Sequence, residues 1–294
     1  MSRRASQEFA QSALQVFYNE FRREISSSRA IIVLGIFVMF DLLMLLSFAY
    51  MLTADPTETN AVPEAFQDPT AETWANIAVI LSGAFYFSLL GLGGASFFGA
   101  GAIARDMKSG TLRLVQATPT PREATYIGRN ISAFFVSYFL AFIGYMVMLI
   151  GFLAVGGLAD LDIVASAEIA LELGLKMQVV IVLSILVAIT TTAAFGTIAK
   201  NPTAAAIAGI SFFILIDSFL GIGADLFPEE WHLENLSFGY HQSEIIRWLI
   251  GSFDRDYARY ETISFPSVSV AILLAIPLIA VGIGIYYFRT MDLD

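Results

Sequence analysis

Two aspartates, Asp41 and Asp217, stand inside long apolar stretches of this sequence, where charged side chains are rare. A carboxylate is costly to place in hydrocarbon, so such a residue usually faces the interior of a helix bundle or water. The central parts of these stretches hold no lysine or arginine that could pair with either carboxylate. Asp41 and Asp217 are therefore candidates for a translocation path or cation site. The alternative in each case is a protonated carboxyl that hydrogen-bonds to a neighbouring helix.

A pair of carboxyls could also serve as the acid and base of an intramembrane aspartyl protease. The Gly-x-Gly-Asp run typical of such proteases is missing, because the run from Gly221 to Asp225 is one residue too long. A serine protease is disfavoured, since neither His232 nor His241 lies inside an apolar stretch. The two histidines also lack the spacing of metal ligands, so we expect surface histidines and no metal site.

Composition places the chain among membrane proteins, because 57% of its 294 residues are hydrophobic and only 14% are charged. The net charge of −10 argues against nucleic-acid binding, which needs a basic surface. Cysteine is absent, which excludes disulfides, thiolate metal sites and a cysteine nucleophile. Acidic residues outnumber basic ones and lysine is rare, a balance that suits a protein from a salt-loving organism.

Six apolar stretches are each long enough to cross the hydrocarbon layer, which takes about 20 helical residues. Backbone groups in lipid must be paired internally, so these stretches form helices. The sequence therefore predicts an all-α membrane protein with six transmembrane helices and no room for a separate soluble catalytic domain. The predicted spans cover residues 30–52, 75–104, 131–156, 176–199, 203–224 and 267–288.

Basic residues concentrate on alternate sides of the predicted spans. The first 29 residues and the loop 105–130 are rich in arginine, whereas 53–74 and 157–175 hold no basic residue. Lysine and arginine near span ends mark the cytoplasmic side. We therefore expect a multi-pass protein of the cell membrane with both termini in the cytoplasm. The long loop 225–266 lies outside, and its aromatic residues predict short amphipathic helices at the outer leaflet.

Residues 1–29 predict an amphipathic helix on the cytoplasmic face of the membrane. An apolar stripe recurs at helical spacing and consists of Phe9, Ala13, Phe17, Phe21 and Ile25. Arg22 and Arg23 lie off this stripe, where they can reach anionic headgroups. The alternative is a frayed leader. A cleaved signal peptide is not expected, because the first apolar run is too long and lacks a small-residue cleavage site.

Small residues recur every four positions on the second predicted span, at Gly91, Ala95 and Gly99. This spacing lets two helices approach closely. Packing within one bundle is the expected use, and the alternative is a seam between two copies of the chain.

The loop after the second span reads RDMKSGTLRLVQATPTPREATYIGR from Arg105 to Arg129. One short part of it has an apolar side, formed by Leu112, Leu114 and Val115. Glycine and two prolines punctuate the segment, and charges surround it. Such a segment forms either a solvated loop or a contact helix for a cytoplasmic partner.

This loop resembles the cytoplasmic loop of ABC-transporter permeases of the six-helix export class, the ABC-2 type membrane proteins. That family often shows an acidic residue, Gly-Thr-Leu, an apolar patch, Thr-Pro, an arginine, and Gly-Lys or Gly-Arg opening the third span. The matching residues are Asp106, Gly110, Thr111, Leu112, Leu114, Thr118, Pro119, Arg122, Gly128 and Arg129. Glutamate is frequent where Asp106 stands. The ending that begins at Phe288 also resembles the family's short cytoplasmic tail.

The resemblance implies that the loop 105–130 docks on an ATP-hydrolysing subunit of an exporter. Its apolar residues Leu112, Leu114 and Val115 should then become buried only in that complex. The chain itself lacks the phosphate loop Gly-x-x-x-x-Gly-Lys-Ser/Thr, since Lys200 follows Gly196 without a second glycine.

We therefore expect no catalysis and no cofactor in this chain, with ATP and Mg²⁺ on a separate ABC-type ATPase subunit. The further expected partners are a second permease, identical or homologous, and membrane lipids. A non-transporting membrane scaffold would show the same pattern. The residues do not specify a substrate.

Overall fold

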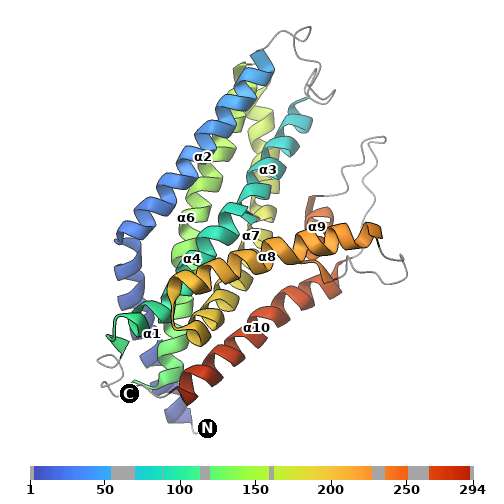
Figure 1. The fold of residues 1–294 in the computed structure, drawn as a ribbon. Coiled ribbons are helices and arrows are strands. Elements are labelled where there is room, and N and C mark those ends of the chain that lie inside the picture. Colours follow the sequence, from blue (N-terminus) through green and yellow to red (C-terminus); the bar gives the residue numbers. More distant parts are fainter. Residues whose placement is uncertain are drawn as a thin grey trace.

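The computed structural model describes residues 3–53, 70–87, 89–112, 120–158, 162–226, 236–250 and 265–291. These ranges are almost entirely helical and contain no strand, which confirms the all-α fold class (Figure 1). The helices are α1 (Arg3–Ile25), α2 (Ser28–Thr53), α3 (Ala71–Phe87), α4 (Leu89–Lys108), α6 (Arg122–Leu158), α7 (Ile163–Ala199), α8 (Pro202–Leu226), α9 (Phe238–Ile250) and α10 (Ser267–Thr290).

Five helical segments in the described part of the chain are long and apolar enough to cross a membrane. They are Ser28–Tyr50, Glu72–Lys108 across α3 and α4, Arg122–Gly157, Ile163–Ala199 and Ser267–Thr290. Each overlaps one predicted span. The remaining predicted span, 203–224, coincides with α8, whose described apolar stretch, Pro202–Ile216, is shorter than a full span. The protein is therefore a multi-pass membrane protein.

Helix α7 begins at Ile163, well before the start predicted at residue 176, so most of the predicted outer loop 157–175 is helix. Asp162 caps this helix, because its Oδ1 accepts hydrogen bonds from the N–H groups of Val164 and Ala165. Glu168 and Glu172, the acidic residues of this part of α7, are exposed, and Glu172 pairs with Lys176 at 2.7 Å. A hydropathy average mixes both faces of a helix and so misses such an extension.

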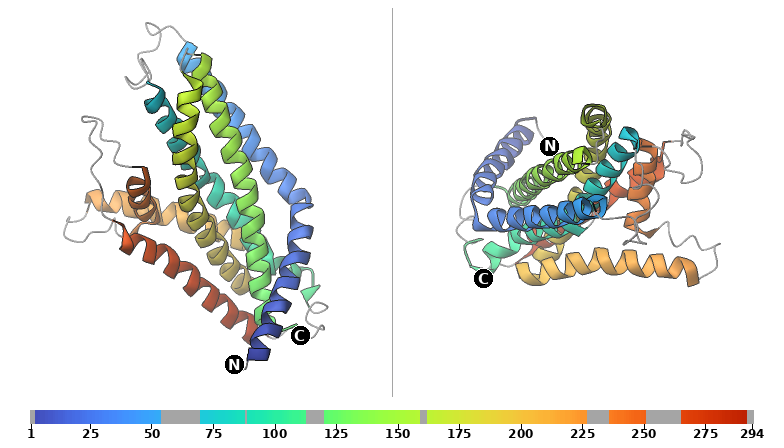
Figure 2. Two further views of the ribbon diagram at one scale, coloured as in Figure 1. Left: turned by 180° about the vertical axis from the view of Figure 1, so that it is seen from behind. Right: turned by 90° about the horizontal axis from the view of Figure 1, so that it is seen from above.

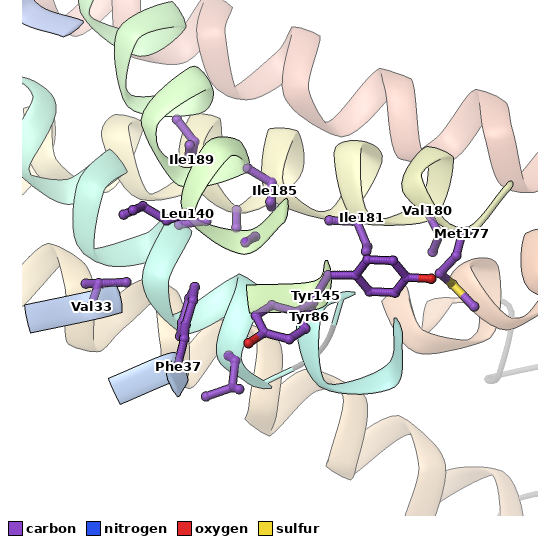
Figure 3. Packing of buried hydrophobic residues seen from close by; sticks show 14 of the residues in the cluster. Val33, Phe37, Tyr86, Leu140, Tyr145, Met177, Val180, Ile181, Ile185 and Ile189 are labelled. Carbon is purple, nitrogen blue, oxygen red and sulfur yellow. The ribbon is translucent and has the colours of Figure 1, made fainter. Parts of the chain in front are cut away.

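Helix α7 is the centre of the bundle and packs against α3, α4, α6, α8, α9 and α10. Figure 3 shows part of its buried face, where Ile181 and Ile185 lie beside Tyr145 of α6 and Tyr86 of α3. The core therefore forms around α7, which contributes aliphatic side chains along its length.

Small residues bring α4 close to α7. A Cβ atom on Gly99 would lie 2.7 Å from the carbonyl oxygen of Ile189, closer than real Cβ contacts. Ala95 is buried on the same helix. Gly91 has a different neighbour, since its Cβ would meet the carbonyl oxygen of Tyr86 near the end of α3. Gly99 thus serves packing within the chain, and Gly91 lies at the junction of α3 and α4.

Helix α9 lies within residues 225–266, where we expect short amphipathic helices at the outer leaflet. In the structure it packs against α7 and α10 of the bundle instead. Its residues Phe238, His241 and Ile245 are buried, and they follow one another at helical spacing. His241 Nδ1 is 3.0 Å from the Ser269 hydroxyl of α10, and Gln242 donates to Ser184 of α7 at 2.5 Å. The expectation of a surface histidine is wrong for His241, because its helical face is the buried one.

Metal ligands do not gather in the described ranges, where no group of three His, Cys, Asp or Glu side chains could hold an ion. His232 lies outside the described residues.

Helix α1 packs along α6 through the apolar stripe expected from the sequence. The Phe17 ring lies 5.6 Å from the Phe135 ring between centroids, and Ala13 approaches Gly128 so closely that a Cβ there would meet its carbonyl oxygen at 2.6 Å. On another side of α1, Leu14 and Tyr18 are exposed. The stripe therefore packs against α6.

Both chain ends lie at one end of the bundle, while α8 and α10 cross the long helices obliquely (Figures 1 and 2). At this end α4 terminates with Arg105 and Lys108, and α6 starts with Arg122 and Arg129. We call it the basic end.

Candidate functional site

The loop that the sequence singles out joins α4 to α6 at the basic end. Its two flanks are described, as residues 105–112 and 120–130. Leu114, Thr118 and Pro119 lie outside the described residues, and so does Val115. The site can therefore be built from the flanks, which hold Asp106, Gly110, Thr111, Leu112 and Arg122.

Asp106 ties the two flanks together. The carboxylate is 8% exposed and lies 2.7 Å from Nη2 of Arg129, whose side chain is only 2% exposed. The second terminal nitrogen of Arg129 donates to the carbonyl oxygen of Ala102 at 3.1 Å. Because Asp106 belongs to α4 and Arg129 to α6, the buried pair fixes the end of one helix to the start of the other.

Helix α1 joins this pair and completes what we call the ion cluster, which comprises Glu20, Arg23, Glu24, Arg105, Asp106 and Arg129. Glu20 lies 3.4 Å from Arg129, and Glu24 pairs with Arg105. Arg23 lies 2.5 Å from Glu20 and 3.7 Å from Asp106. Three carboxylates face three guanidinium groups, so the formal charges cancel in a largely buried setting.

Burial perturbs the Glu20 carboxyl of the ion cluster. Burial raises the pKa of its carboxyl, and the nearby Arg129 and Arg23 offset only part of that effect. A carboxyl with a raised pKa favours the folded state in acid, and this contribution is lost as the pH rises through the folded-state pKa. Glu20 therefore holds α1 in place less firmly when it is ionised than its short contacts suggest.

An exposed tip follows the ion cluster on α4. Gly110 has a φ of 73°, a left-handed conformation that suits glycine, and its N–H bonds to the carbonyl oxygen of Met107 at 3.1 Å. Lys108, Ser109 and Thr111 are exposed around this turn, and the two hydroxyls lie 2.8 Å apart. We call residues 108–111 the tip. It follows the end of α4 and exposes one cation and two hydroxyls.

Leu112 does not match the expectation that it is buried only in a complex. Its side chain is 1% exposed and belongs to the core of the chain itself. An apolar residue in a loop indicates burial, but its sequence does not show whether the chain or a partner buries it. The exposed part of this flank is therefore the tip.

Arg122, at the other flank, contacts the end of α10. Its Nη1 donates to the carbonyl oxygens of Arg289 and Met291, both at 3.1 Å. Glu123 pairs with Arg289 at 3.0 Å. The two segments that resemble one family, the loop and the tail, thus lie against each other in the fold.

Asp41 lies in the interior of the bundle, away from the loop. Its carboxylate is fully buried, and the Tyr86 hydroxyl donates to its two oxygens at 2.8 and 2.9 Å. Gly144 leaves room for that hydroxyl, because a Cβ there would collide with it. Asp217 lies on α8, and its side chain is outside the described residues. Among the described side chains, the partner of Asp41 is therefore a phenol.

Sequence reasoning missed the ion cluster and Tyr86. Glu20 and Glu24 follow Ala13 and Phe17 at helical spacing, which places two acids on the otherwise apolar stripe of α1 and signals buried partners. Arg105 and Arg129 were read only as markers of orientation and of the family pattern. No comparable signal marks Tyr86, because tyrosine is common in apolar helices.

The family model described as ABC-2 family transporter protein matches residues 14–293 of the chain. No curated protein matches the chain. The matched range begins within α1 and includes every other helix, so it contains the ion cluster, the loop and the contact between α6 and α10.

Proposed function

The chain belongs to the ABC-2 transporter family, and we propose that it is the permease subunit of an ATP-driven exporter whose ATPase is a separate polypeptide. The observation that carries this proposal is the pairing of Asp106 with Arg129, which anchors both ends of the loop at the basic end. A docked ATPase can move the bundle only if its contact point is fixed to the helices. The ion cluster supplies that fixation.

Coupling runs from the tip into three helices. The tip is continuous with α4, Asp106 connects α4 to α6, and Glu24 of α1 pairs with Arg105. A buried ion pair resists separation, because pulling the partners apart leaves an uncompensated charge. ATP-driven closure of two ATPase subunits would therefore displace α1, α4 and α6 together and shift the bundle between inward-facing and outward-facing states.

The proposed topology has six spans, with α8 as the fifth, and both termini in the cytoplasm of the cell. The basic end supports this orientation, because lysine and arginine favour the cytoplasmic side. At about 1.5 Å per residue, the 37 residues of α6 are much longer than the hydrocarbon layer. Arg122 and Arg129 thus have room to lie outside hydrocarbon at the start of this helix. Helix α1 then lies at the cytoplasmic surface with Leu14 and Tyr18 toward the lipid headgroups.

A functional unit of two permeases and two ATPases fits this arrangement. We propose that ATP and Mg²⁺ bind only to the ATPase, since the sequence contains no phosphate loop. The second permease is either another copy of this chain or a homologue. Asp41, paired with Tyr86, is proposed to line the moving interior rather than to contact the ATPase.

The experiment that tests this function is purification of the tagged chain from its native membranes, followed by identification of bound polypeptides and an ATP hydrolysis assay. We expect a polypeptide with a phosphate loop to copurify and to carry all the hydrolysis. The chain stripped of that polypeptide should hydrolyse none. Hydrolysis by the stripped chain, or a complex that holds no ATPase, would contradict the proposal and favour a scaffold.

A further inference from the structure

The C-terminal end of α10 is held at the start of α6 by several independent contacts. Phe288 is 1% exposed, and its ring lies 5.9 Å from the Tyr126 ring between centroids. Gly284 lies against the Tyr126 hydroxyl so closely that a Cβ would collide with it. These contacts bury the last two turns of α10 on one side.

Arg122 adds a polar contact that depends on the exact end of α10. The last carbonyl groups of a helix have no partner within the helix. Arg122 donates one nitrogen to two of them, on Arg289 and Met291, each at 3.1 Å. A lysine could not reproduce the rigid geometry of this planar donor. Arg122 therefore caps α10 from the flank of the loop.

The capped end of α10 presents exposed groups at the same end of the bundle as the tip. Arg289 is 64% exposed although it pairs with Glu123, and Thr290 is exposed beside it. In Figure 1 the end of α10 and the end of α4 lie at the same end of the bundle. A protein that covers this whole end of the bundle would meet both Lys108 and Arg289.

We infer that the end of α10 forms a second part of the ATPase docking surface, held in register with the tip by Arg122. This inference rests on the proposed function. The surface carries exposed cations on both parts, Lys108 and Arg289, so it fits an acidic groove on the ATPase. Because Arg122 lies in the second flank of the loop, displacement of the loop also displaces α10.

Photocrosslinking tests this surface directly, because the chain has no cysteine and single cysteines can be placed at will. The variants Lys108→Cys, Thr290→Cys and Val164→Cys are labelled with benzophenone maleimide in membranes that contain the copurifying ATPase. Val164 is 80% exposed at the opposite end of the bundle and serves as the negative control. We expect Lys108→Cys and Thr290→Cys to crosslink to the ATPase and Val164→Cys to give no product.

The outcomes separate the inference from the function on which it rests. Crosslinking from Lys108→Cys without any from Thr290→Cys would overturn the second docking part and leave the permease function intact. Crosslinking from neither position would overturn both. Adding Arg122→Ala to Thr290→Cys should abolish its crosslink, while Lys108→Cys with Arg122→Ala still reacts. If Arg122→Ala leaves the Thr290→Cys product unchanged, Arg122 does not hold α10 in register.

Discussion

Arg129 shows how much one buried cation determines at the basic end. It contacts Asp106 of α4, Glu20 of α1 and a carbonyl oxygen of α4, and its side chain is nearly inaccessible. The sequence indicated its place at the opening of a span. It could not indicate the partners, because Glu20 and Asp106 come from helices distant in the chain. An arginine that counts as a marker of membrane orientation can thus also form a buried structural ion pair.

Asp106→Asn should destabilise the folded chain by about 3 kcal/mol or more, since it removes the nearest carboxylate from the buried Arg129 and leaves the ion cluster with one excess positive charge. Thermal unfolding of the purified protein in detergent measures this effect. The matched control is Glu172→Gln, which breaks the exposed pair with Lys176 and should leave the unfolding temperature unchanged. Equal effects of the two substitutions would show that the ion cluster does not stabilise the fold.

Asp41 should tolerate asparagine better than leucine. An amide oxygen still accepts from the Tyr86 hydroxyl, whereas leucine leaves that hydroxyl buried without a partner, at about 1–3 kcal/mol. Unfolding temperatures of Asp41→Asn, Asp41→Leu and Tyr86→Phe give the comparison. If Asp41→Asn folds normally and yet abolishes transport, the carboxylate charge itself serves the translocation path.

At the scale of elements, the length of the apolar stretches predicted which segments form long membrane-type helices, but not where each helix begins and ends. The stretch 30–52 lies within α2 and 267–288 within α10, because both are apolar on all sides. The start of α7 was missed because Glu168 and Glu172 lie on one face of a continuous helix. The burial of α9 was missed because His241 and Gln242 find hydroxyl partners on α10 and α7, which no local pattern reveals.

Gly99→Val should destabilise the contact between α4 and α7. The added side chain would meet the backbone of Ile189, and such overpacking costs about 1–3 kcal/mol. Gly93→Val is the matched control, because a Cβ on Gly93 has no atom within 4 Å. Unfolding temperatures measured side by side should fall for Gly99→Val beyond the shift for Gly93→Val. The same shift in both variants would mean that only the change in helix propensity matters.

At the scale of the molecule, three segments far apart in the sequence converge on one end. Helix α1 reaches the loop through the ion cluster, and the end of α10 reaches it through Arg122. The family resemblance pointed to the loop and the tail separately. Their contact could not be predicted, because it depends on how α6 and α10 pack. This convergence joins four helices at the basic end, as the proposed coupling requires.

The most direct test is ATPase binding by a variant whose tip is acidic, with both Lys108→Asp and Thr111→Asp. Both residues are exposed, so the substitutions leave the core and membrane insertion intact. The control is Lys176→Asp, which removes a cation from the N-terminal half of α7 and leaves the tip unchanged. The account predicts that the tagged wild-type and control chains retain the ATPase on purification and that the tip variant loses it. Full retention of the ATPase by the tip variant would contradict the assignment of this loop as the coupling element.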